Sequence, residues 1–237
     1  MADALTIARR ELSAYFNSPV AYAVVVLFLV ITGALFWQTY FDEVSLLSMR
    51  DYFDQAPLML AFFAPALTMG LVATEERSGT LQWLMTMPLR TRDIVLGKFL
   101  AAMALFAIVF AMTLPYPYTL SLLGDLDWGA VATGYLGLMC LTSAYAAIGL
   151  MASSFTRDQV VAILLAFSIC FFLYLIDLLV AQPSGAWTRA VEYASSNYHF
   201  QNLARGVIDL QSIVYYLSLT VGALVITTLR IDARRWT

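Results

Sequence analysis

The residues best suited to chemistry gather in one segment, 71–100, which reads "LVATEERSGTLQWLMTMPLRTRDIVLGKFL". Glu75 and Glu76 begin a Glu-Glu-x-x-x-Arg pattern of the kind that an intramembrane protease would use, but Thr80 stands at its arginine position. Metal-assisted hydrolysis is not supported, because the chain has one histidine and such centres need several nitrogen or sulfur ligands. The segment therefore does not predict a proteolytic site.

Phosphate-binding and redox motifs are also missing from the sequence. A nucleotide-binding loop ending at Gly97 and Lys98 would need a glycine where Arg92 stands. Cys140 and Cys170 lie far apart within apolar stretches, and no Cys-x-x-Cys motif occurs. We therefore predict that the chain is not an enzyme and holds no metal or cofactor of its own.

The composition indicates a protein that is solvated mainly by lipid. Of 237 residues, 61% are hydrophobic and 12% are charged, where a soluble domain carries about 25% charged residues. The mean hydropathy is +0.77. Six continuous apolar stretches are long enough to cross a hydrocarbon core about 30 Å thick, which favours helices over a barrel. They are residues 20–41, 57–74, 99–123, 129–152, 160–181 and 213–229. We predict an all-α, multi-pass membrane protein with a single domain, 1–237.

The basic residues predict the orientation. Ten of the 13 Lys and Arg residues fall at the termini and in the second and fourth connections; the other three are Arg50, Arg189 and Arg205. By the positive-inside rule, both termini and segment 75–98 are cytoplasmic, and loop 182–212 is extracytoplasmic. We expect short helices in that loop, with the lone His199 in a structural role. The net charge of −3 does not favour a nucleic-acid partner.

Several features within the spans have two interpretations. Pro115 and Pro117 should bend or break the third span, either as packing or as part of a pathway. The fourth span is rich in small residues, which predicts an interior helix. Asp177, an acid inside a predicted span, is a pathway candidate, although snorkelling to the nearby outer boundary or a local hydrogen bond is the favoured explanation. We expect an interfacial belt of aromatic residues: Tyr22, Trp37, Tyr40, Trp128, Trp187, Tyr215 and Tyr216.

Residues 1–19 predict an amphipathic helix that lies in the cytoplasmic interface. Apolar side chains recur at helical spacing, and basic residues occupy the other faces. The apolar set is Leu5, Ala8, Leu12, Tyr15 and Phe16. Asn17, Ser18 and Pro19 then predict a turn before the first span. This helix is either a plain topological anchor or an elbow helix near a cytoplasmic partner.

Segment 75–98 predicts a short helix between two caps. Thr80 can cap a helix over 81–86, which Pro88 ends, and Thr91 can cap the next helix. Asp93 suits the first turn of that next helix because of the helix dipole. Leu81, Leu84 and Met85 are too apolar for a free loop. They should be buried against the bundle or against a partner.

These motifs resemble those of ABC-2-type transporter permeases, and more narrowly the gliding-motility-type permease subunit. The resemblance rests on E-E-R-S-G-T followed by T-x-P-L and I-V-x-G-K, on "ARRELSAYFNSPVAY", and on "SSNYHFQNLARGVIDLQSIVYYLS". It implies a bacterial inner-membrane permease that dimerises with a second copy or a related permease. It further implies a cytoplasmic ATPase subunit that binds ATP and Mg, and often an auxiliary protein with a large extracytoplasmic domain.

The resemblance also implies that segment 75–98 contains a coupling helix that contacts the ATPase. The coupling residues would be Glu76, Arg77, Gly79, Thr80, Leu81, Leu84, Met85, Pro88 and Arg90, with Thr86, Arg92 and Lys98 at neighbouring positions. The function expected on this basis is substrate export or mechanical work driven by ATP hydrolysis in the partner. The alternative is a membrane scaffold or sensor that anchors an ATPase and extracytoplasmic partners without transport.

Overall fold

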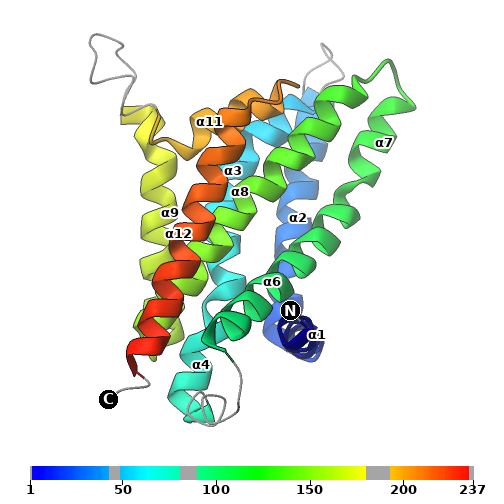
Figure 1. Ribbon diagram of the computed structural model, residues 1–237. Coiled ribbons are helices and arrows are strands. Elements are labelled where there is room, and N and C mark those ends of the chain that lie inside the picture. The colour runs from blue at the N-terminus through cyan, green and yellow to red at the C-terminus, as the bar shows by residue number, and fades with distance from the viewer. Residues whose placement is uncertain (1, 43–48, 81–89, 180–192, 235–237) are drawn as a thin grey trace.

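The computed structural model describes residues 2–42, 49–80, 90–179 and 193–234, and these are almost entirely helical (Figure 1). Within those ranges no strand occurs. The helices are α1 (Ala2–Phe16), α2 (Pro19–Asp42), α3 (Arg50–Thr68), α4 (Gly70–Ser78), α6 (Thr91–Thr113), α7 (Pro115–Ser121), α8 (Trp128–Phe155), α9 (Gln159–Leu179), α11 (Ser196–Ala204) and α12 (Leu210–Arg234).

Among the described residues, six candidate membrane spans confirm the predicted number, although each begins before the predicted apolar stretch. They run over Pro19–Gln38, Arg50–Ser78, Thr91–Ser121, Trp128–Phe155, Gln159–Ile176 and Leu210–Ala233. The second span extends in both directions past the predicted 57–74, and the third begins eight residues before the predicted 99. Hydropathy marks only the part of a helix that meets lipid, whereas backbone hydrogen bonding continues into its polar ends.

Helix α8 is the centre of the bundle, as its small residues predicted. It packs against α3, α6, α9, α11 and α12. Gly134 and Gly149 allow close approach, because a Cβ at these positions would lie 2.4 Å from the Phe53 ring and within 2 Å of the Thr68 hydroxyl. Helices α2, α9 and α12 are mostly exposed and form the outside of the bundle. Helix α8 is therefore the interior helix of the described bundle.

Two prolines interrupt the third span where the sequence predicted. Helix α6 ends at Thr113, and α7 begins with Pro115 in its first turn. The break leaves the Thr113 carbonyl available, and the Tyr135 hydroxyl of α8 donates to it over 3.1 Å. The break is thus held by a hydrogen bond from the central helix.

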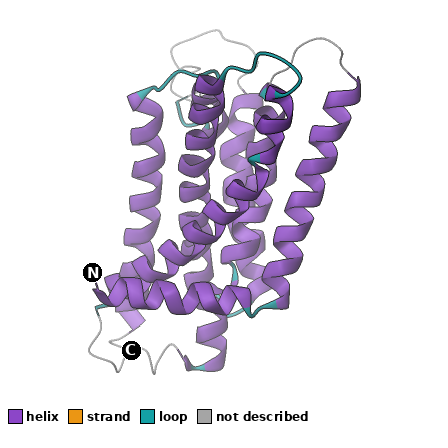
Figure 2. Ribbon diagram, turned by 90° about the vertical axis from the view of Figure 1, so that its right-hand side faces the viewer, coloured by secondary structure: helices purple, strands orange, loops and turns teal. Residues whose placement is uncertain are grey.

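Helix α1 lies across one end of the bundle, at the end where both termini are found (Figures 1 and 2). Its buried side matches the predicted apolar face in part: Leu12 and Tyr15 pack against the core, and Ala4 and Ile7 are also buried, whereas Leu5 and Phe16 are exposed. The reason is that α1 has two apolar sides, one that packs on α6 and one that faces outward. Helical spacing alone could not tell which of them the protein uses.

The opposite end of the bundle carries α11, the short helix expected within loop 182–212 (Figure 1). His199 is buried there and makes structural hydrogen bonds, as described below. Tyr22, Trp37 and Trp128 are exposed, as belt residues would be, but Tyr216 is buried and donates to the Ser196 carbonyl. Tyr216 therefore serves packing around α11, and the prediction that it is a belt anchor was wrong. Tyr215 is half-buried and donates to the Ala194 carbonyl over 2.7 Å.

Candidate functional site

The E-E-R-S-G-T motif ends the second span with a glycine cap. Gly79 adopts the left-handed conformation, with φ of 75°, and its amide donates to the Glu76 carbonyl at the end of α4. The hydroxyls of Ser78 and Thr80 both donate to the Glu75 carbonyl, over 3.3 and 3.4 Å. Arg77 lies in the last turn, where a cation suits the helix dipole. The predicted turn at Ser78 and Gly79 is confirmed, and its role is to terminate α4.

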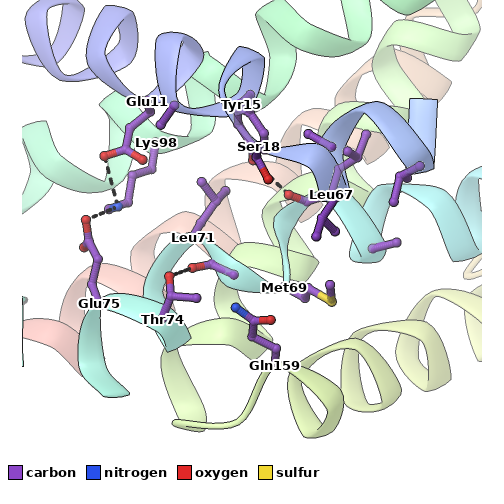
Figure 3. Close-up of a pocket in the computed structure, with 16 residues that line it drawn as sticks. Glu11, Tyr15, Ser18, Leu67, Met69, Leu71, Thr74, Glu75, Lys98 and Gln159 are labelled. Carbon is purple, nitrogen blue, oxygen red and sulfur yellow. Dashed lines mark hydrogen bonds and ion pairs between the residues drawn. The ribbon is translucent and has the colours of Figure 1, made fainter. Parts of the chain in front are cut away.

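The two glutamates of the motif take part in two different ion pairs. Glu75 Oε1 lies 2.8 Å from Lys98 Nζ of α6, and Lys98 Nζ lies 3.3 Å from Glu11 Oε1 of α1 (Figure 3). Arg10 of α1 contacts both carboxylates, at 2.6 Å from Glu11 and 3.6 Å from Glu75. These four residues, which we call the charged cluster, join α1, α4 and α6. Residues 75 and 98 lie in the helices before and after the predicted coupling helix, so the cluster connects these two helices.

The charged cluster is electrically balanced and mostly buried. The Lys98 side chain is 1% exposed, and those of Glu11 and Glu75 are 12% and 17% exposed. The hydrogen bond with Glu11 raises the pKa of Arg10. A buried ammonium needs carboxylates on more than one side to offset its lost hydration. Lys98 thus requires both α1 and α4 to be in place.

The I-V-x-G-K motif forms the seat of α1 on α6. Ile94 packs against Ile7 in a small buried cluster. Gly97 comes so close to α1 that an added Cβ would lie 2.7 Å from Ile7 Cβ and 2.9 Å from the Ala4 carbonyl oxygen. The motif therefore supplies an apolar contact, a site of close approach and the cluster's buried cation within five residues.

Glu76 makes the second connection. Its Oε1 accepts a hydrogen bond from Arg157 Nε over 2.9 Å. Arg157 follows α8 and precedes α9, so this pair joins α4 to the turn between two later spans. The Arg157 side chain is 78% exposed, and the pair is therefore weak compared with the charged cluster.

The junction between α3 and α4 is held by a hydroxyl from the central helix. Ser153 Oγ donates to the Met69 carbonyl over 2.7 Å and accepts from the amides of Val72 and Ala73 over 3.1 and 3.0 Å. A side chain inserted in this way replaces the helix's own hydrogen bonds. Tyr15 of α1 donates to the Leu67 carbonyl over 2.8 Å at the same junction. Helix α4 is thus a separate helix from α3, which forms the rest of the second span.

The prediction that Thr91 caps α6 was wrong. The capping position is Arg90, with extended backbone and no side-chain hydrogen bond, and Thr91 is the first helical residue. The Thr91 hydroxyl instead donates to the Asp232 carboxylate near the end of α12. The hydroxyl was needed by a partner 141 residues away, which local sequence could not indicate. Asp93 does lie in the first turn, as predicted.

The remaining predicted site residues divide into two groups. Glu76, Arg77, Gly79, Thr80 and Arg90 flank the coupling segment. Leu81, Leu84, Met85 and Pro88, together with the predicted helix 81–86, lie outside the described residues. Asp177 belongs to α9, but its side chain also lies outside what is described.

Sequence reasoning missed Glu11, Ser153, Arg157 and Asp232. Each acts across a large sequence separation, and the only available signal was a charged group or a hydroxyl close to a span end.

The arrangement is suited to transmitting force and shows no catalytic grouping. Among the residues described, no three His, Cys, Asp or Glu side chains come together as a metal site. The charged groups pair with one another across helices, and none is arranged as a nucleophile with a base. The ion pairs connect α4 and α6, the two helices that flank segment 81–89, to each other and to α1.

Comparison with known proteins identifies the family. The model of the family described as ABC-2 family transporter protein matches residues 5–229 of the 237. A comparison with curated proteins gave no match. The match covers the α1 motif, the segment between α4 and α6, and the stretch from α11 into α12, which are the three stretches that carried the sequence resemblance. The chain therefore belongs to the ABC-2 transporter family, whose members are multi-pass permease subunits that work with a separate ABC ATPase.

Proposed function

We propose that this chain converts ATP hydrolysis by a cytoplasmic ATPase into substrate export or mechanical work across a bacterial inner membrane. The single observation that carries the proposal is the 2.8 Å ion pair between Glu75 and Lys98. It ties the helix before segment 81–89 to the helix after it. A displacement of that segment by a partner would therefore move α4 and α6 together, and α1 with them.

The α3–α4 junction supports the same proposal. Ser153 and Tyr15 take over backbone hydrogen bonds there, so α4 is a distinct short helix at the end of a buried span. A short, capped helix transmits a displacement without bending, and a junction held by a few hydrogen bonds can rearrange at modest cost. Nucleotide-driven closure of the ATPase would then shift α4 relative to α3 and rock the bundle.

The finer features of the proposal follow the family resemblance. The apolar residues Leu81, Leu84 and Met85 would fill a groove on the ATPase, with Arg77 and Arg90 at its charged rim. ATP and Mg would be bound by the ATPase alone. Two permeases would pair, as identical or related copies, and an auxiliary protein with a large extracytoplasmic domain would complete a gliding-motility-type complex. Asp177 is retained as a candidate pathway residue.

The test is purification from the native membrane in mild detergent, followed by mass spectrometry of the associated proteins. Wild type should bring an ABC ATPase with it, and Leu84→Asp should lose the ATPase while still inserting. The matched control is Leu122→Asp, because Leu122 is 71% exposed at the far end of α7. It should retain the ATPase.

A wild-type complex without ATPase would contradict the proposal, as would equal retention by Leu84→Asp. A further arm measures substrate handling with the Glu76→Ala variant. Loss of the bound ATPase from this variant with no change in substrate handling would favour the scaffold or sensor function.

A further inference from the structure

A cavity of about 260 Å³ lies beneath α1 at the end of the bundle that carries the termini. Its walls come from α1, the first turns of α2, the α3–α4 junction, and Gln159 at the start of α9 (Figure 3). Neither the family match nor the coupling proposal gives it a role. Its volume is just below the range of about 300–1,000 Å³ that is typical of small-ligand sites. It can therefore take a headgroup more readily than a whole large molecule.

The lining of the cavity is divided by polarity. Glu11, Glu75 and Lys98 lie together at one side, whereas Leu67 lies away from them toward α2 (Figure 3). Val20 and Val24 of α2 add to the apolar side. A ligand that satisfies both sides must be amphiphilic, with a charged head and an apolar remainder.

The charged side determines the kind of head. Lys98 Nζ also lacks a well-aligned hydrogen-bond acceptor, but two carboxylate oxygens at 2.8 and 3.3 Å already offset its charge, which disfavours an anionic head. Glu75 Oε2, by contrast, is buried and has no hydrogen-bond partner among the described residues, although Oε1 of the same group contacts Lys98. A buried carboxylate oxygen without a donor is costly, and a donor carrying positive charge satisfies it best. The head should thus contain an ammonium group with N–H donors.

The apolar side indicates where the ligand comes from. Val20 lines the cavity, is 55% exposed, and stands at the start of a membrane span, so the cavity borders the lipid phase. Ser18 and Gln159 add neutral hydrogen-bond donors between the two sides, which suits a phosphate next to the ammonium. A membrane phospholipid meets these requirements without leaving the bilayer.

We propose that the cavity binds the headgroup of a phospholipid with a primary ammonium, of the phosphatidylethanolamine type. The ammonium donates to Glu75 Oε2, the phosphate lies near Ser18 and Gln159, and the upper acyl chain packs on Val20 and Val24. The lipid then bridges α1, α2 and α4, so that the seating of α1 depends on the surrounding bilayer. This inference is independent of ATPase coupling.

The test is native mass spectrometry of the delipidated full chain with phosphatidylethanolamine, phosphatidylcholine and phosphatidylglycerol of identical acyl chains. Phosphatidylcholine lacks N–H donors, and phosphatidylglycerol lacks the ammonium. Wild type should bind phosphatidylethanolamine about tenfold more tightly than either, which corresponds to one charge-assisted hydrogen bond. Glu75→Gln should abolish that preference, and its matched control Glu76→Gln should keep it, because Glu76 pairs with Arg157 and does not line the cavity.

A second variant fills the cavity without changing its charge. Ala14 is an exposed residue of α1 that lines the cavity, so Ala14→Trp should block the site while preserving the fold. It should lower phosphatidylethanolamine binding to the level of phosphatidylcholine. Equal binding of the three lipids by wild type, or an unchanged preference in Glu75→Gln or Ala14→Trp, would overturn the proposal. Displacement of the lipid by an equal concentration of free phosphoethanolamine would assign the site to a soluble ligand and overturn the lipid source.

Discussion

The two ends of the bundle each hold a short helix, and they do so with opposite chemistry. At the end with the termini, α1 is held by the charged cluster and by close approach at Gly97. At the other end, α11 is held by neutral hydrogen bonds and stacked rings around His199. Ion pairs depend on charge, salt and neighbouring groups, whereas a neutral network is satisfied in one arrangement. The comparison teaches that the adjustable contacts are at the end where coupling is proposed.

The neutral network has a defined proton arrangement. His199 Nε2 lies 3.1 Å from the Tyr193 carbonyl oxygen, which can only accept, so Nε2 carries the proton. Nδ1 then accepts from the Ser212 hydroxyl over 3.1 Å. The imidazole stacks on Tyr215 with ring centroids 4.2 Å apart. Ser195 caps α11 by accepting from the Tyr198 amide. Of these contacts, the acceptance by Nδ1 from Ser212 needs a neutral histidine.

The largest expected effect is that of Lys98→Met at the charged end. It leaves the carboxylates of Glu11 and Glu75 together with only the exposed Arg10 as counterion, and breaking such a buried pair costs about 3–5 kcal/mol. The measurement is thermal unfolding in detergent. The control Arg50→Met loses an exposed pair with Asp54, at 4.0 Å, and should lower the Tm much less than Lys98→Met. Lys98→Met combined with Glu75→Gln should recover part of the loss. If it recovers none, the cluster does not act as a unit.

Gly97→Ala should have the next largest effect. The new Cβ would meet Ile7 and the Ala4 backbone, so α1 must shift, and overpacking of this kind costs about 1–3 kcal/mol. Protease sensitivity of the N-terminal region should rise together with the loss in Tm. Gly222 has nothing within 4 Å of its Cβ position, so Gly222→Ala should be neutral or stabilising by up to about 1 kcal/mol. A tolerated Gly97→Ala would mean that α1 is not seated by close approach.

Acidification tests the neutral end. Burial lowers the pKa of His199, so the folded protein favours the neutral imidazole. Stability is therefore complete above the ordinary pKa of about 6.5 and falls as the pH drops through and below that value, by at most about 1.4 kcal/mol per pH unit. The Tm should decline between pH 7 and pH 5.5, and this slope should be absent in His199→Gln. A slope that persists in the variant would place the titrating group elsewhere.

The smallest effect is expected for Arg157→Gln. Its partner Glu76 is largely covered, but Arg157 itself is 78% exposed, so the pair should contribute less than about 1 kcal/mol. The difference in Tm between the variant and wild type should shrink in 1 M salt, which screens an exposed pair. A large effect on Tm would make this pair an essential connection between α4 and the α8–α9 turn. The expected difference in stability between this exposed pair and the buried ion pairs of Lys98 would then be wrong.

The sequence was sufficient for those features that depend on short-range pattern. Continuous apolar stretches predicted six spans, Pro115 and Pro117 predicted the break in the third, and small residues predicted that α8 is interior. The local signal at Gly79 likewise predicted the end of α4.

The charged cluster was beyond prediction for a physical reason. Its partners at positions 11, 75 and 98 meet only when three helices cross, and each residue alone is an ordinary interfacial charge. Two hydrogen bonds could not be predicted for the same reason. They run from the Thr91 hydroxyl to the Asp232 carboxylate and from the Ser153 hydroxyl to the Met69 carbonyl. Polar groups near span ends have many local roles, and only packing selects among them.

The seat of α1 on α6 also has a consequence for the order of synthesis. Helix α1 ends at Phe16, but Ile94, Gly97 and Lys98, which receive it, follow about 80 residues later in the chain. A chain made from its N-terminus must therefore hold α1 without its seat until two spans and the start of the third have been produced. An amphipathic helix can wait on the membrane surface during that time. Closure of the long loop between α1 and α6 should thus be a late step of assembly, completed only when Lys98 arrives between Glu11 and Glu75.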